Sequence, residues 1–271
     1  MSLPELTPEN YYDHDVRSQY MTVHTFLDYA GYLGVLGCEA RAEAMRKGEW
    51  SEPTTKAMLI GSYVDASIEG EEAIEKFREE HPEIFLKDGV TLKADFKQAE
   101  LMLERMREDA YFMSTLSGEK QKIFTADLFG TTWCCKLDSY IPDTAIVDLK
   151  TTSDLHRMWK VQDYGYVSVA EYWGYTIQLA VYQRIVEINT GKKLPCYLSF
   201  VTKEEYPELC VVNIDQVTLD HALNTVEMNM PTIIAIRNGE QKPCRCEKCN
   251  YCKSTKKLTH AISMFDLIED F

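Results

Sequence analysis

Two aspartates and one lysine are spaced in this sequence so that they could hold a metal ion against a phosphate group. Asp138 and Asp148 lie in two segments rich in Trp, Tyr, Ile, Val and Thr, a composition that predicts strands, and Lys150 follows Asp148 closely. A turn signal at 142–144 joins the two segments into a hairpin. Carboxylates bind hard cations such as Mg²⁺, and a lysine beside them could orient a water molecule or steady a phosphate under attack.

The turn also predicts the register of this hairpin. If Ile141 pairs with Ala145, the two aspartates face each other and Lys136 faces Lys150, all on one face of the hairpin. Opposed aspartates repel unless a cation lies between them. One interpretation is therefore a divalent ion shared by both carboxylates and the backbone carbonyl of Leu149. The other is an exposed ladder in which the lysines screen the aspartates.

The opposite face of the predicted hairpin is apolar. It carries Trp133, Cys135, Leu137, Val147 and Leu149. We expect these side chains to form one layer against a core, so that the charged face looks toward solvent or a cleft.

A helix with two polar residues on one face is predicted downstream. Gln178 and Tyr182 are four residues apart within an apolar pattern of helical period. Alone they would be ordinary boundary residues, but together with Asp138 and the DLK motif at 148–150 they resemble the PD-(D/E)XK nucleases of the RecB type, in which D…(D/E)xK precedes a QxxxY helix. The resemblance implies that both aspartates bind metal, that Lys150 is the catalytic lysine, and that the helix pair positions the lysine or a phosphate.

The resemblance also implies a third metal ligand upstream. RecB-type nucleases often carry a histidine at the end of a GxxxH helix, whereas LIGSYVDASIEG has Gly61 and, four residues on, Asp65. Asp65 is nominated as the ligand in place of the histidine; the alternative is a solvated helix face. Glu119, in SGEKQ, is a weaker candidate that would otherwise be solvated. The implied cofactor is Mg²⁺, as one or two ions, with Mn²⁺ as a substitute.

Further segments narrow the resemblance to phage exonucleases related to the RecE recombination nuclease. They include YMTVHTFLDYAGYLGVLGCEARAEA, IVDLKTT, WGYTIQLAVYQ and CEKCNYCKSTKK, and they span nearly the whole chain. The resemblance implies a 5′ to 3′ exonuclease acting on the ends of linear double-stranded DNA in phage recombination, with a single-strand annealing protein as partner and a homo-oligomeric ring as its assembly. Two alternatives stay open: a RecB- or CRISPR-type nuclease acting on single strands or flaps, and a non-catalytic nucleic-acid-binding module organised by metal-bound cysteines.

Four of the nine cysteines crowd into residues 244–252, which indicates metal binding and not a disulfide framework. Cys246, Cys249 and Cys252 have the C-x-x-C-x-x-C spacing of loops that wrap a [4Fe–4S] cluster. The resemblance to RecB-type nucleases with such clusters nominates Cys38 as the fourth ligand and leaves Cys244 spare or as an alternative. Zinc and unliganded thiols are the other hypotheses.

The composition sets conditions on any DNA-binding role. The net charge is -14, from 43 acidic and 29 basic residues, and such a charge repels phosphate unless basic residues cluster. They do so in LHRMWK at 155–160 and CKSTKK at 252–257. No secretory signal or membrane-spanning run is visible, so we expect a cytoplasmic protein of a bacterial host cell, without membrane contact.

The order of predicted elements indicates an α/β fold with a restriction-endonuclease-like mixed central β-sheet flanked by helices. With 271 residues, 45% of them hydrophobic, the chain can form one core. We expect a single nuclease domain over 1–271 with a mainly helical N-terminal part, a catalytic core and a cysteine loop with a tail, at 1–115, 116–240 and 241–271. The predicted helices lie at 23–48, 55–80 and 94–109, with a late helix interrupted around Pro231, and the first strands at 119–127, 131–141 and 145–152.

Overall fold

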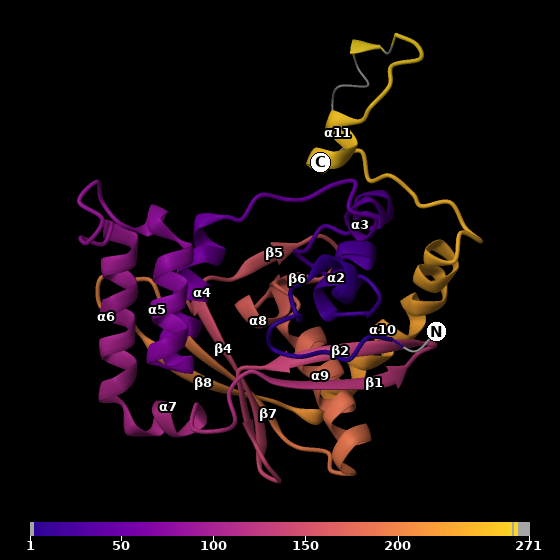
Figure 1. Ribbon diagram of the computed structural model, residues 1–271. Helices are drawn as coiled ribbons and strands as arrows, with labels where there is room; N and C mark the ends of the chain where they lie inside the picture. The colour runs from indigo at the N-terminus through magenta and orange to yellow at the C-terminus, as the bar shows by residue number, and fades with distance from the viewer. Residues whose placement is uncertain (1–2, 262, 265–271) are drawn as a thin grey trace.

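A mixed four-stranded sheet lies at the centre of the computed structural model, which describes residues 3–261 and 263–264 (Figure 1). The strand order is β3-β4-β7-β8; β4 is parallel to β7, and the other neighbours are antiparallel. Two further antiparallel pairs, β1 with β2 and β5 with β6, form small sheets of their own. The strands are β1 (Lys122–Leu128), β2 (Thr131–Leu137), β3 (Ser139–Ile141), β4 (Ala145–Thr152), β5 (Trp159–Val161), β6 (Gly165–Val167), β7 (Cys196–Thr202) and β8 (Leu209–Ile214).

Helices cover both faces of the central sheet, so the predicted α/β fold with a helix-flanked mixed sheet is confirmed (Figure 1). α4 to α7 pack on one face and α9 and α10 on the other. No helix among the described residues is long and apolar enough to cross a membrane. The helices are α1 (His14–Arg17), α2 (Val23–Ala30), α3 (Glu39–Arg46), α4 (Lys56–Glu69), α5 (Glu71–Glu80), the 3-10 helix η1 (Pro82–Ile84), α6 (Ala94–Glu108), α7 (Ala110–Thr115), α8 (Val169–Tyr172), α9 (Tyr175–Thr190), α10 (Gln216–Arg237) and α11 (Asn250–Ser254).

Side-chain alternation along β4 separates two hydrophobic clusters. Val147 and Leu149 pack with α4 to α7, whereas Ile146 packs with α9. Asp148 therefore points toward α9, like Ile146. The predicted single apolar layer of the hairpin is wrong, because Trp133 and its neighbours in β2 belong to the α9 cluster.

The predicted strand 131–141 is divided into β2 and β3 by a bend at Asp138. The predicted register holds in β3, where Ile141 pairs with Ala145. The predicted pairing of Lys136 with Lys150 is wrong, because Lys136 lies in β2 and β2 pairs with β1 instead of β4. The third predicted strand, at 145–152, coincides with β4.

Glycines divide two of the predicted long helices. The first becomes α2 and α3, with Gly31 at φ 70° after α2, and the second becomes α4 and α5, with Gly70 at φ 150° between them. These are backbone conformations that favour glycine and end a helix. The predicted interruption at Pro231 is wrong: α10 runs through it, because proline removes only one N–H donor while Met230 and Ile233 stay packed in the core. The predicted tail lies partly outside the described residues, at 265–271.

Candidate functional site

Asp148 is a buried carboxylate at the centre of a chain of polar contacts. Its residue is only 2% exposed. Oδ1 accepts a hydrogen bond of 2.8 Å from Nε2 of Gln178, and Oδ2 forms an ion pair with Nζ of Lys150. The same Gln178 amide donates to the hydroxyl of Tyr182 at 3.1 Å. The predicted shared face of Gln178 and Tyr182 is therefore observed, and it looks inward to Asp148.

Lys150 is held between this carboxylate and an aromatic ring. Its Nζ lies 4.9 Å from the ring centroid of Tyr175, the first residue of α9, and its side chain is 19% exposed, so it retains access to solvent. Burial alone would lower the pKa of Lys150, but the charges of Asp148 and Asp138 outweigh burial and raise it. Sequence reasoning missed Tyr175, although its position one helical turn before Gln178 places it on the same face.

The pKa of Asp148 is also raised, to about 7. Burial is the main cause; Lys150 opposes the shift and the charge of Asp138 adds to it. The two pKa values rise for different reasons. Burial disfavours the ionised form of Asp148 and so raises its pKa, whereas the negative charges of two carboxylates favour the ionised form of Lys150 and so raise its pKa. The site therefore concentrates negative charge in a poorly solvated place, an arrangement that a bound cation would relieve.

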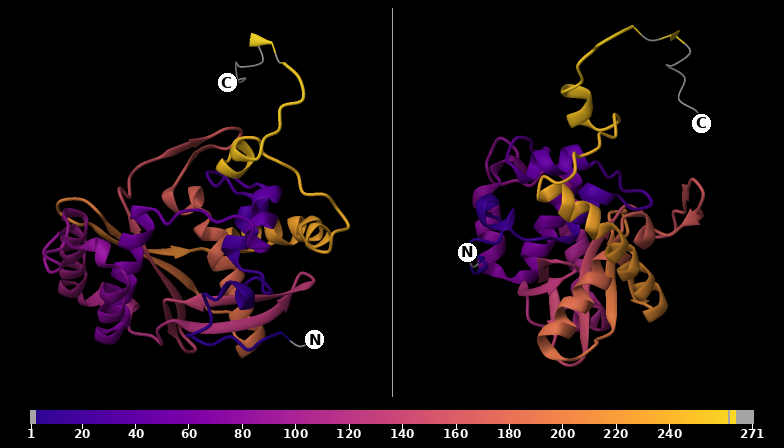
Figure 2. Two further views of the ribbon diagram at one scale, coloured as in Figure 1. Left: turned by 45° about the horizontal axis from the view of Figure 1, so that its top comes forward. Right: turned by 90° about the vertical axis from the view of Figure 1, so that its right-hand side faces the viewer.

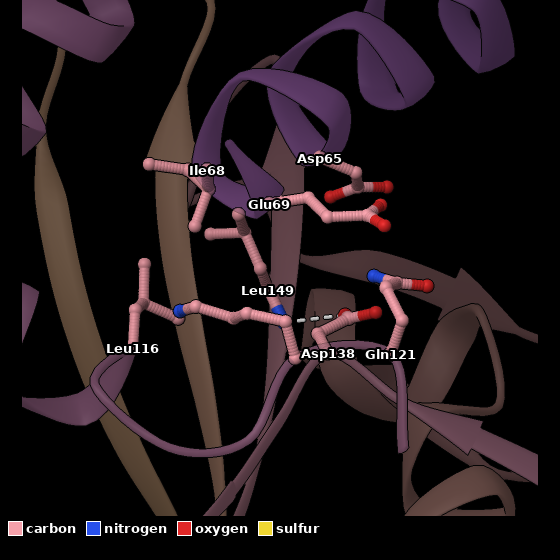
Figure 3. A pocket seen from close by; sticks show the side chains of 8 residues that line it. Asp65, Ile68, Glu69, Leu116, Gln121, Asp138 and Leu149 are labelled. Carbon is pink, nitrogen blue, oxygen red and sulfur yellow. Dashed lines mark hydrogen bonds between the residues drawn. The ribbon is translucent and has the colours of Figure 1, made fainter. Parts of the chain in front are cut away.

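Asp138 connects the polar contacts around Asp148 to a small polar cavity beside β4 (Figure 3). Because β3 stops pairing with β4 at Val147, the N–H of Leu149 is free to donate to a side chain, and Oδ2 of Asp138 accepts it at 2.9 Å. Figure 3 shows Asp65 and Glu69 of α4 extending over the same space. The cavity is lined by Asp65, Ile68, Glu69, Leu116, Lys120, Gln121, Asp138 and Leu149.

The predicted third carboxylate lies at this cavity, and the weaker candidate does not. Burial, with the charge of Asp138, raises the pKa of Asp65 well above its usual range. Glu119 instead pairs with Lys122 at 2.8 Å and is absent from the cavity lining. Lys120, which sequence reasoning missed, lines the cavity, and burial lowers its pKa although Asp138 acts in the opposite direction.

The donor chemistry of the site suits a hard cation. Asp65, Asp138 and Asp148 are close enough for their charges to perturb one another, and carboxylate oxygens are the ligands that Mg²⁺ prefers. In the described part of the chain, these carboxylates do not form a ligand set as close as the one formed by four cysteines.

Cys38, Cys246, Cys249 and Cys252 form that second constellation. Their four Sγ atoms lie within 4.8 Å of one another, with Cys252 at 3.6 Å from Cys38 and at 3.9 Å from Cys246. Cys38 precedes α3, whereas Cys249 and Cys252 belong to the start of α11, so the cluster joins segments distant in sequence. Cys244 is exposed and outside this set.

Backbone amides surround the thiols of the C-terminal loop. Sγ of Cys246 accepts N–H groups from Lys248 at 3.4 Å and Cys249 at 3.3 Å, and Sγ of Cys249 accepts one from Cys252 at 3.4 Å. Donors of this kind stabilise thiolate charge and orient sulfur ligands. The remaining cysteines lie in strands: Cys134, Cys135 and Cys196 are buried, and Cys210 is half-buried.

Comparison with known proteins gives two informative matches. Residues 26–255 match the model of a family described as a PDDEXK-like domain of unknown function (DUF3799). A crystal structure from Eubacterium rectale, of a protein named as a candidate exonuclease, is 44% identical, covers 97% of this chain and 98% of that chain, and has a TM-score of 0.94. The crystal structure of SSO0001 is 9% identical over 69% of this chain and 82% of that chain, with a TM-score of 0.26, too low for the folds to be compared. No curated protein matches the chain.

Proposed function

The chain belongs to the family of PDDEXK-like domains, and from this membership we propose that it is a metal-dependent deoxyribonuclease that hydrolyses phosphodiester bonds. The buried contacts of Asp148 with Lys150 and Gln178 are the observation that carries the proposal. The name of the relative from Eubacterium rectale supports an exonuclease. We assign its action to the ends of linear double-stranded DNA.

Mg²⁺, as one or two ions, would be held by Asp65, Asp138, Asp148 and the backbone carbonyl of Leu149, with Mn²⁺ as a substitute. When bound, the metal supplies a Lewis acid that activates water and neutralises phosphate charge. Donor chemistry supports this assignment, because three carboxylates crowd a poorly solvated place that needs positive charge.

The protein's own side chains have separable tasks in this proposal. Gln178 fixes the rotamer of Asp148 by donating to Oδ1, and Tyr182 receives the second amide hydrogen. Tyr175 and Asp148 together fix Nζ of Lys150, which then donates to a phosphate oxygen as negative charge develops on it. In the reaction a water molecule gives up a proton as its oxygen bonds to phosphorus, the ester bond to the leaving oxygen breaks, and that oxygen takes up a proton.

The finer features of the activity rest on the resemblance to RecE-related exonucleases and stay predictions. They are the 5′ to 3′ polarity, a role in phage recombination, a single-strand annealing partner and a homo-oligomeric ring. The action of residues 1–271 as one nuclease domain is likewise a prediction. The alternative within nucleases, cleavage of single strands or flaps, is separated by comparing those substrates with linear duplex DNA.

The test compares Lys150→Ala with Lys192→Ala on linear duplex DNA labelled at either the 5′ or the 3′ end, with Mg²⁺ or with EDTA. Lys192 is an exposed lysine that pairs with Asp143 at the β3–β4 turn, at 2.7 Å, and serves as a matched control. We expect Lys150→Ala to lose at least a hundredfold in rate, because a preorganised donor to the phosphate is lost, and Lys192→Ala to match the wild type.

Controls distinguish the functional classes. Cutting of closed circular DNA would contradict the exonuclease assignment. If Lys150→Ala and the wild type are equally inactive on every DNA substrate, the chain is a binding module and the proposal fails.

For the four-cysteine cluster we propose a single zinc ion. Around one ion with Zn–S bonds of about 2.3 Å, tetrahedral thiolates stand about 3.8 Å apart. Two of the Sγ separations, 3.6 and 3.9 Å, agree with that value, and every pair of Sγ atoms lies within 4.8 Å. A [4Fe–4S] cluster places four iron atoms between the thiolates and holds them farther apart, so these separations favour zinc over the iron–sulfur hypothesis.

A further inference from the structure

The hairpin formed by β5 and β6, which follows β4 in the chain, carries three large exposed side chains, two of them aromatic. Met158, Tyr164 and Tyr166 are 69%, 71% and 67% exposed. Large apolar side chains scattered singly over a surface need no explanation, but three on one small hairpin form a patch that indicates binding. Figure 2 shows the hairpin standing away from the body of the molecule.

One face of the hairpin is held by the protein and the other is free. Lys160 pairs with Tyr166 across the ladder and Met158 lies two residues earlier, so these three share the outer face. Trp159 and Val167 form a second pair, which faces the other way; Trp159 stacks on Tyr172 of α8, with centroids 4.1 Å apart and an interplanar angle of 19°.

The base of the hairpin is fixed at both of its ends. At its entry, Nε2 of His156 lies 3.1 Å from the carboxylate of Glu208, just before β8. At its exit, Ser168 and Glu171 form a capping box that starts α8. The outer face is therefore presented on a supported base, which lowers the entropic cost of binding.

The hairpin is continuous with the proposed active site at both ends. It leaves β4 shortly after Lys150, and it returns through α8 to Tyr175, whose ring lies under Lys150.

The charge of the hairpin segment is more favourable for binding a nucleic acid than the strongly negative charge of the whole chain. Residues 153–168 contain two basic and two acidic residues, in a chain of net charge -14. Among the described residues, neither the Arg157 guanidinium nor the Lys160 ammonium forms an ion pair, and the Arg157 guanidinium lies 3.8 Å from the ring centroid of Trp159. Both cations are thus available to phosphate groups next to rings on which bases could stack.

We propose that the outer face and the turn of the β5–β6 hairpin bind unpaired nucleotides at the end of a DNA substrate, with Tyr166 and the turn residue Tyr164 stacking on bases and Lys160 contacting the backbone. This inference rests on the proposed function, because it names the form of DNA that the active site receives. Stacking suits a nuclease that acts on many sequences, since every base offers a π-face.

The test uses the full chain without added Mg²⁺, so that cleavage does not occur, and a duplex with an unpaired extension of about six nucleotides that contains 2-aminopurine. We expect binding to quench the 2-aminopurine fluorescence, and Tyr164→Ser with Tyr166→Ser to bind about tenfold more weakly and to lose the quenching. The variant with Tyr164→Phe and Tyr166→Phe should keep both the affinity and the quenching, because it keeps the aromatic rings. Tyr111→Ser, at an equally exposed tyrosine (67%) on α7, is the matched control and should behave as the wild type.

Failure of this inference differs from failure of the proposed function. If the wild type cleaves DNA but the double Ser variant binds and quenches as the wild type does, the hairpin inference is overturned and the nuclease stands. If the wild type neither cleaves nor binds any DNA, both are overturned. Equal weakening on a blunt duplex and on the extended one would also overturn the assignment to unpaired nucleotides.

Discussion

Gln178 links the DLK motif of strand β4 to the QxxxY motif of helix α9, because its amide contacts residues of both. Its amide bonds to Asp148 and to Tyr182, and all three residues are buried, so a substitution at Gln178 changes the orientation of the carboxylate before it changes anything at the surface. Gln178 is therefore a positioning residue in the proposed reaction.

We predict that Gln178→Ala raises the Mg²⁺ concentration for half-maximal DNA cleavage and lowers the rate by about 10- to 100-fold, because loss of a group that orients a metal ligand has effects of that size. Gln183→Ala is the matched control, since Gln183 is buried in the same helix but donates to the Leu194 carbonyl at 2.8 Å, away from the site. Titration of activity with Mg²⁺ and a melting curve for each variant make the measurement. Equal loss of activity in both variants would indicate general loosening of α9 and contradict the positioning role.

For single residues, the sequence was most informative where the repeat of a strand or helix decides which side chains lie on the same face. Alternation along a strand and the turn at 142–144 were enough to place Asp138 near Asp148, and the spacing of four was enough for Gln178 and Tyr182. Lys120 and Tyr175 could not be nominated so easily, because a lysine in a loop and a tyrosine at a helix start gain meaning only from what the fold brings next to them.

α2 and α3 are fastened to each other by a buried carboxylate. Glu43 of α3 is 5% exposed; it accepts a hydrogen bond of 2.6 Å from the Tyr29 hydroxyl of α2 and two from Arg46, at 2.6 and 2.9 Å. Burial opposes ionisation, but Arg46, Tyr29 and Lys47 outweigh it and lower the pKa of Glu43 to about 2. The ionised form is thus part of the folded structure.

This shift predicts a pH-dependent contribution to stability. Because the pKa is lower in the folded state than the usual value of 4.5, the contribution is complete above about pH 5 and is lost as the pH falls toward 2. Glu43→Gln should therefore reduce the free energy of unfolding by up to about 3 kcal/mol at pH 7, with a difference that shrinks steadily toward pH 3. Denaturant unfolding at several pH values measures it, with Glu79→Gln, at an exposed glutamate of α5, as control. A difference that stays constant with pH would contradict the assignment.

Element boundaries were harder to predict than element types. One predicted strand is divided at Asp138 because its first half, β2, pairs with β1 and its second half, β3, pairs with β4. Local composition does not indicate which partner each half will have. The breaks at Gly31 and Gly70 had a local signal, whereas Pro231 gave a false one because packing on both sides of it keeps α10 continuous.

The four-cysteine cluster acts on the whole molecule, because Cys38 and Cys252 are 214 positions apart. A crosslink that closes so long a loop restricts the unfolded chain, an effect worth about 5 kcal/mol in the loop-entropy model. Spacing alone pointed to three of these clustered cysteines; Cys38 came only from family resemblance, since no local pattern marks it.

We predict that the purified protein is colourless, contains one zinc ion per chain, and loses on the order of 10 °C in melting temperature when the metal is removed. Cys252→Ser should lose the zinc and show the same drop in melting temperature. Cys244→Ser should keep the zinc and the wild-type melting temperature, because Cys244 lies outside the cluster. Elemental analysis and calorimetry measure these outcomes. A brown protein with iron and broad absorption near ~400 nm would reject zinc.

Among the described strands, β5 and β6 pair only with each other, so the chain could be cut at the turn between them without changing the strand order of the central sheet. Asp138, Asp148 and Lys150 would then belong to one fragment, and Gln178 and Tyr182 to the other. Neither fragment alone would hold the complete chain of contacts around Asp148. The turn is therefore a natural place to divide the protein into a split enzyme, in which DNA cleavage reports that the two halves have reassembled.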